Sequence, residues 1–143
     1  MERWTGRLAV VTGASAGIGA TIAKTLVKNG INVVGMARRV DKIQALAKEL
    51  ENEKGKLIAV QCDVSDSASV QSAFQTVEEC HGGVDILINN AGILGKTSLL
   101  DGPVEDWSRI LSVNVIGLCH CTKLAVKSMR ERKVDDGQII HIS

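Results

Sequence analysis

The sequence contains a glycine-rich turn, TGASAGIG at 12–19, between an apolar run and a helical pattern. Glycine permits a tight reversal, and the absence of Cβ atoms lets backbone N–H groups approach a phosphate. The N-terminus of the following helix adds a partial positive charge. A structural tight turn is the alternative, since the spacing G-x-x-x-G-x-G departs from the common dinucleotide fingerprint. The residues expected around the phosphate are Gly13, Ala14, Ser15, Ala16, Gly17, Ile18 and Gly19.

A pair of basic residues, Arg38 and Arg39, follows the second apolar run, INVVGMA. Proteins that bind NAD usually place an acidic residue here, where it holds the ribose 2′-hydroxyl. Two guanidinium groups instead suit a 2′-phosphate, through charge-assisted and bidentate contacts. Ser15 could add a hydroxyl to the same phosphate. The sequence therefore predicts NADP(H) as the cofactor, with a solvated basic pair as the alternative.

Two more motifs follow the third and fourth apolar runs. Asp63 comes directly after LIAVQC and could accept a hydrogen bond from an adenine amino group, with Val64 against the ring; a turn or cap role is the alternative. After VDILI, the run NNAG contains Asn90, Ala91 and Gly92. Small residues there let a cofactor lie against the backbone, and asparagine amides can satisfy backbone groups where a strand ends.

The elements that must position these motifs alternate along the whole chain. Continuous apolar runs predict buried strands at 8–11, 31–37, 57–62, 84–88 and 138–142. Helical periodicity predicts a helix from Ile18 to Gly30, one capped by Asp41, one opened by Ser65 or Ser67, and a long stretch after Pro103. This order predicts an α/β fold, a doubly wound parallel sheet of the Rossmann type. The first and fourth strands would then flank the point where the strand order reverses and the cofactor lies.

Composition limits the other possibilities. The 143 residues fit one domain, and 17 basic against 16 acidic residues give no electrostatic footprint for nucleic acid or anionic lipid. The charged N-terminus does not resemble a signal peptide, and no apolar run approaches the ~20 residues of a membrane span. We therefore expect a cytoplasmic protein without membrane or nucleic-acid partners. The four cysteines show no metal-ligand spacing, so reduced thiols and no metal site are expected.

The motifs together resemble the short-chain dehydrogenase/reductase superfamily, in order and along the whole chain. The family pattern T-G-x-x-x-G-I-G is matched at 12–19 and N-N-A-G at 89–92, and Asp63-Val64 fits as well. The segments 1–4 and 134–137 look like the dehydrogenase/reductase member 11 group, which includes insect farnesol dehydrogenases and vertebrate ketosteroid reductases. The resemblance implies an NADP-binding domain over 1–143 that lacks the family's C-terminal strands and helices, and a dimer or tetramer.

The family's catalytic set is Asn, Ser, Tyr and Lys, and the resemblance carries over only the first of these, to Asn114. This residue lies on an otherwise apolar helical stripe, where a buried amide needs partners; a helix kink held by its side chain is the structural alternative. The strand IIHIS resembles the one that leads into the family's Ser, so Ser143 would precede the catalytic position. The sequence has no tyrosine.

Two functions follow. The first is an oxidoreductase that transfers hydride between NADP(H) and an apolar alcohol or carbonyl substrate, farnesol-like or ketosteroid-like by resemblance. In that case these 143 residues alone are expected to be inactive. The second is a non-catalytic nucleotide-binding or regulatory fragment of such an enzyme. A methyltransferase is disfavoured, because such enzymes usually need an acidic residue where Arg38 and Arg39 stand.

Overall fold

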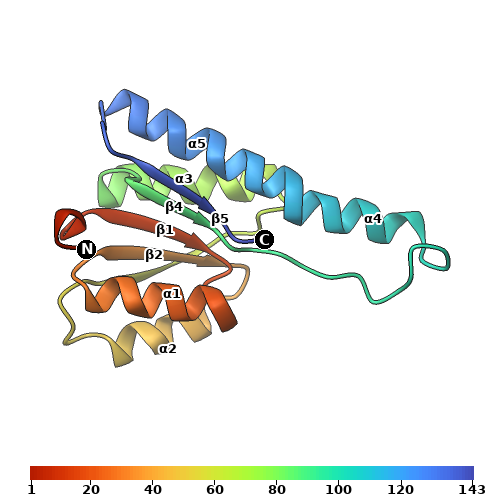
Figure 1. Ribbon diagram of the computed structural model, residues 1–143, viewed down its shortest axis with the longest axis horizontal. Helices are drawn as coiled ribbons and strands as arrows, with labels where there is room; N and C mark the ends of the chain where they lie inside the picture. Colours follow the sequence, from red (N-terminus) through yellow and green to blue (C-terminus); the bar gives the residue numbers. More distant parts are fainter.

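The computed structural model describes residues 1–143 as one parallel sheet with helices on both faces (Figure 1). Five strands lie in the order β3-β2-β1-β4-β5, and all four neighbouring pairs are parallel. The strands are β1 (Leu8–Thr12), β2 (Asn32–Ala37), β3 (Leu57–Gln61), β4 (Ile86–Asn89) and β5 (Gln138–His141). The predicted strands are therefore confirmed, with boundaries that shift by no more than two residues.

The helices divide between two layers. Helices α1 (Gly17–Lys28) and α2 (Asp41–Glu49) cover one face of the sheet, and α3 (Ser67–His81) and α5 (Leu118–Glu131) cover the other (Figure 1). Each layer has its own buried cluster, because strands covered on both sides send alternate side chains to opposite faces. Val11 and Val33 face α1 and α2, whereas Val10 and Val34 face α3 and α5.

The strand order reverses between β1 and β4. The chain runs from β1 outward to β2 and β3, then returns to place β4 on the other side of β1. The turn after β1 and the loop after β4 consequently lie side by side at the carboxyl edge of the sheet. This is the predicted position of the ligand crevice in a doubly wound fold.

Several helix starts differ from the expectation. Asp41 is the first residue of α2 and makes no capping bond, since Val40 occupies the N-cap. Neither Ser65 nor Ser67 caps α3; Asp66 does, accepting from the backbone N–H groups of the second and third helical residues. Ile18 does not face the core as predicted. It is 62% exposed and lies in the first turn of α1.

The long helical stretch after Pro103 is interrupted. It consists of α4 (Val104–Leu111), a π-helical segment at Ser112–Gly117 and α5, in one continuous run. Its outer side carries exposed apolar residues, among them Trp107, Leu111 and Val115. The stretch Val104–Glu131 also reaches the length and mean hydropathy of a helix that could cross a membrane, although polar residues interrupt its apolar runs. Its inner side packs on β4 and α3, as in a folded α/β domain.

At the opposite, amino edge of the sheet a buried carboxylate ties three segments together. Asp85, just before β4, accepts from the backbone N–H of Leu8 at 3.0 Å and pairs with Arg7 at 3.3 Å and Arg132 at 3.1 Å. Arg7 also pairs with Asp136 at 2.9 Å. The hydrogen bond from Arg7 holds the pKa of Asp136 below its usual range. The N-terminal segment is thus fastened to the loop that precedes β5.

Candidate functional site: a pocket at the switch point

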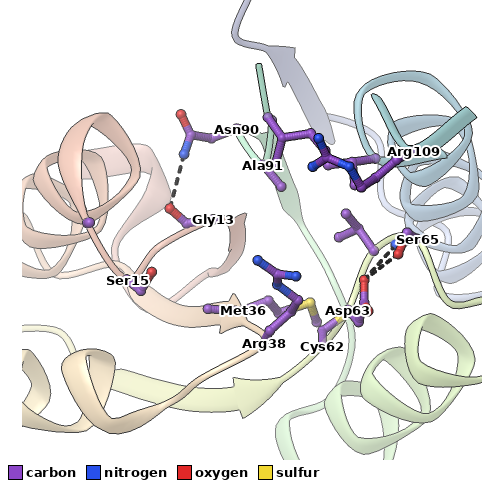
Figure 2. Close-up of a pocket in the computed structure, with 16 residues that line it drawn as sticks. Gly13, Ser15, Met36, Arg38, Cys62, Asp63, Ser65, Asn90, Ala91 and Arg109 are labelled. Atoms are coloured by element: carbon purple, nitrogen blue, oxygen red, sulfur yellow. Dashed lines mark hydrogen bonds between the residues drawn. The ribbon is translucent and has the colours of Figure 1, made fainter. Parts of the chain in front are cut away.

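A cavity of about 490 Å³ opens at the carboxyl ends of the strands, where the strand order reverses. Figure 2 shows it between the turn after β1, the end of β2, the segment after β3 and the loop after β4. The remaining wall comes from Arg109 of α4 and Val113 of the π-helical segment. The lining residues are Gly13, Ser15, Ala16, Met36, Ala37, Arg38, Cys62, Asp63, Val64, Ser65, Asn90, Ala91, Gly92, Ile93, Arg109 and Val113.

The turn after β1 and the loop after β4 are fastened to each other. The hydroxyl oxygen of Thr12 accepts from the backbone N–H groups of both Asn90 and Ala91, each at 3.0 Å. In return, Asn90 Nδ2 donates to the carbonyl oxygen of Gly13 at 3.1 Å, drawn as a dashed line in Figure 2. The predicted use of asparagine, to satisfy backbone groups at a strand end, is confirmed for Asn90.

The three glycines of the turn serve different purposes. A Cβ on Gly19 would collide with the carbonyl of Gly13 and with the side chain of Asn90. Gly13 has φ +65°, and a Cβ there would lie 2.9 Å from Ala91 Cα. Gly17 also has positive φ, +57°, but faces open space. Gly13 and Gly19 therefore allow close packing against the loop after β4. Gly17 instead permits the positive φ at the start of α1.

The predicted phosphate turn lies at the pocket, but not every residue reaches it. Gly13, Ser15 and Ala16 line the cavity. Ala14 is buried beneath the turn, where its backbone N–H donates to Met36 O at 3.2 Å. Gly17, Ile18 and Gly19 stand just outside the lining, in the first turn of α1.

Of the two basic residues after β2, only Arg38 lines the pocket. In Figure 2 its guanidinium rises into the cavity from the wall that carries Met36. Its backbone is held by Gln61 Nε2, which donates to Arg38 O at 3.2 Å. The guanidinium has no acidic partner within the chain. Arg39 is exposed and lies outside the lining.

Asp63 both stabilises a turn and lines the pocket. Its Oδ1 accepts from the backbone N–H of Ser65 at 3.0 Å and from the Ser65 hydroxyl at 2.7 Å. Its backbone N–H donates to Ser69 Oγ at 2.9 Å. Oδ2 has no partner within the chain. Next to it, burial raises the pKa of the Cys62 thiol to about 11, and the Asp63 charge acts in the same direction.

Asn114 lies in the π-helical segment and does not line the pocket. Its Oδ1 accepts from Ile93 N at 2.8 Å, and its Nδ2 donates to Ile93 O at 2.9 Å. The amide therefore has the partners that were expected. The helix is irregular at this point, but the side chain bonds the loop and not the helix backbone. The long helical stretch therefore holds the loop after β4 through Asn114 and lines the pocket through Arg109 and Val113.

Sequence reasoning missed seven lining residues: Met36, Ala37, Cys62, Ser65, Ile93, Arg109 and Val113. Most of them adjoin a predicted motif along the chain, so extending each motif by one or two residues would have found them. Arg109 and Val113 are different, because only the path of the long helix across the sheet brings them there. Asn114 pointed to that helix, and residues one and five positions before it line the cavity.

The comparison with protein families is decisive for the class. The family model for short chain dehydrogenase matches residues 7–143. The chain belongs to the short-chain dehydrogenase family. Among curated family members, dehydrogenase/reductase SDR family member 11 of Gallus gallus is 49% identical over 145 residues, covering 100% of this chain and 57% of the relative. Farnesol dehydrogenase of Aedes aegypti is 50% identical over 145 residues, again covering 100% of this chain and 59% of the relative.

Solved structures of the family share the fold. L-sorbose reductase from Gluconobacter frateurii, complexed with NADPH and L-sorbose, superposes with a TM-score of 0.90 at 33% identity, covering 99% of this chain and 54% of that one. A metagenomic short-chain oxidoreductase in complex with NADP gives 0.90 at 35% identity, covering 98% and 63%. This chain thus spans somewhat more than half the length of the relatives it matches.

Proposed function

We propose that the pocket binds NADP(H) and that the whole protein is an oxidoreductase acting on an alcohol or carbonyl compound. The observation that carries the proposal is Arg38, whose guanidinium has no partner in the chain and lines the same cavity as the glycine turn. An unpaired cation at the end of β2 favours a 2′-phosphate over a free 2′-hydroxyl. The NADP and NADPH complexes of the two structural relatives support the same choice.

The residues present suit the cofactor. Gly13, Ser15 and Ala16 would take the pyrophosphate, because they line the cavity at the turn that precedes the N-terminus of α1. Asp63 Oδ2 and Val64 would take the adenine, one as acceptor and the other as an apolar surface. When bound, NADP(H) supplies the hydride chemistry, and the protein's part is to position it.

The remaining assignments rest on the loop after β4 and on Asn114. Ala91 and Gly92 leave the backbone accessible at the centre of the pocket, next to Asn90. Asn114 would support the catalytic residues while it holds Ile93 in place. These assignments agree with the family resemblance, in which the corresponding asparagine is a catalytic residue.

An apolar substrate is the finer part of the proposal. The similarity to the Aedes aegypti farnesol dehydrogenase favours it. So do three exposed leucines on the segment that follows the NNAG loop, Leu94, Leu99 and Leu100, which are 75–93% exposed. Cytoplasmic location and assembly into a dimer or tetramer stay predictions of the sequence.

The proposal is tested by titrating the protein with NADPH and NADH and following the quenching of its Trp fluorescence. We expect saturable binding, at least tenfold tighter for NADPH by the ~1.4 kcal/mol that one charge-assisted contact contributes. Equal affinity for the two would reject the 2′-phosphate assignment, and no binding of either would reject the proposed function.

A second function, nucleotide binding without turnover, is favoured by one observation: these 143 residues include no tyrosine. The two are separated by assaying NADPH oxidation with farnesal and with ketosteroids. The protein spanning the full length of its relatives should turn over. A version limited to residues 1–143 should bind NADPH without oxidising it.

A further inference from the structure

Arg109 enters the pocket from the wall that faces Arg38. It belongs to α4, and it lines the cavity together with Val113, one helical turn later. Figure 2 shows the two arginines on opposite sides of the cavity, with Arg109 extending from the helix toward Ala91. No motif in the sequence indicated a cation at this place.

The guanidinium of Arg109 has almost no partner of its own. Its one ion-pair partner is Asp106, at 4.0 Å and only three residues earlier on the same exposed helix. Such a pair contributes little in solvent. The side chain is 52% exposed and makes no hydrogen bond. It is therefore free to bind a ligand without first breaking a strong interaction.

The surroundings of Arg109 identify the part of a nucleotide that it would meet. In Figure 2 Arg109 lies on the side of the cavity that also carries Ser65 and Asp63. Val64 and Val113 belong to the same lining, and Arg109 and Ser65 share a second groove as well. Two valines provide an apolar surface, and no aromatic residue lines the cavity. A planar base at this end has no aromatic ring to stack on, and a guanidinium plane is the group that can replace one.

A polar groove continues from the same point. Its volume is about 330 Å³, and its lining is wholly polar: Ser65, Glu105, Ser108, Arg109 and Ser112. It shares Ser65 and Arg109 with the larger pocket. Arg109 thus lies where the two cavities meet, beside the part of the pocket that carries Asp63. From there its side chain can lie over a bound base.

We propose that Arg109 is a cofactor-contacting residue that stacks its guanidinium on the purine base and holds the nucleotide regardless of the 2′-phosphate. This inference rests on the proposed function. It assigns different tasks to the two arginines, since Arg38 recognises the phosphate and Arg109 the base. A second contact to the same phosphate is disfavoured, because Arg109 shares its end of the pocket with the carboxylate of Asp63.

The test compares three ligands on two variants. Arg109→Met removes the charge and the plane but keeps the length, and Arg109→Lys keeps only the charge. Arg130→Met, on the exposed part of α5, is the control for a general loss of positive charge. Dissociation constants are measured by calorimetry for NADPH, NADH and nicotinamide mononucleotide, which has no adenine. Thermal unfolding checks that each variant is folded.

With Arg109→Met we expect affinity to fall about fivefold for NADPH and NADH alike, the effect of a cation–π contact in a partly exposed site. The affinity for nicotinamide mononucleotide should not change, and Arg130→Met should match the wild type. Arg109→Lys keeps the cation but not the stacking plane, so it should lose only part of the same affinity. Unchanged binding of both dinucleotides would overturn the inference, and so would a loss confined to NADPH. If the wild-type protein itself binds no dinucleotide, the proposed function fails before the variants are compared.

Discussion

Asn114 and Ile93 are joined by a pair of hydrogen bonds, in which one side-chain amide satisfies both backbone polar groups of one residue. Oδ1 accepts from Ile93 N at 2.8 Å and Nδ2 donates to Ile93 O at 2.9 Å. The amide reaches the loop from the π-helical segment at Ser112–Gly117. Short π-helical segments are rare and occur frequently at functional sites. The irregular helix and the loop that lines the pocket are therefore one structural unit.

Replacing Asn114 with Ala should release that loop. Because both backbone groups of Ile93 lose their partner, we expect the free energy of unfolding to fall by about 1–3 kcal/mol. Hydrogen exchange should accelerate at Ile93 and its neighbours before it does so in the strands. Asn114→Asp keeps an acceptor for Ile93 N and should have the smaller effect on that amide. Unchanged exchange at Ile93 in the Ala variant would show that the loop is held by other contacts.

Gly19 and Gly17 form a matched pair for testing the turn. Gly19→Ala places a Cβ against the carbonyl of Gly13 and the side chain of Asn90, so the turn must move away from the β4 loop. We expect a loss of about 1–3 kcal/mol in stability, the usual range for overpacking a tight site, together with loss of NADPH binding.

The control, Gly17→Ala, meets no atom and suffers only from its positive φ of +57°. That strain should destabilise by about 1–2 kcal/mol. A Gly19→Ala variant that keeps both wild-type stability and NADPH binding would contradict the close-packing role of Gly19. Thermal and denaturant unfolding measure both variants.

The pair Arg7–Asp136 should make stability depend on pH in the acid range. Since the pKa of Asp136 is lowered in the folded protein, mainly by the hydrogen bond from Arg7, its contribution is present above the unfolded pKa. It is lost as the pH falls through the lowered pKa, below about pH 4. Asp136→Asn should therefore lower the melting temperature at pH 7 and change it much less at pH 3. High salt should reduce the difference, because the carboxylate is exposed.

The architecture was accessible from the sequence, because buried parallel strands and amphipathic helices leave different periodicities. The order of elements, the helix stop at Gly30 and the position of the glycine turn are all confirmed. Errors arose where local patterns have several solutions. Asp66, rather than a neighbouring serine, caps α3, and Ile18 continues an apolar stripe but is exposed to solvent.

The site was predicted in part for a similar reason. Motif residues at strand ends converge once the topology is known, so Gly13, Arg38 and Asp63 lie around one cavity as expected. Arg109 could not be found in this way, since its place depends on how the long helix continues from α5, which packs on β4, past the ends of the strands to α4 (Figure 1). The sequence likewise could not predict that Arg38 lines the pocket and Arg39 does not. That depends on the direction of the chain after β2.

If Arg38 recognises the 2′-phosphate, its replacement must change the ratio of the NADPH and NADH dissociation constants. In the variant Arg38→Asp, NADPH should bind at least ~100-fold more weakly, because a carboxylate repels the phosphate where a guanidinium held it. NADH should bind almost as before, so the preference should reverse. Arg39→Asp, outside the pocket, should leave the ratio nearly unchanged. Equal losses of NADPH and NADH affinity in Arg38→Asp would contradict the account.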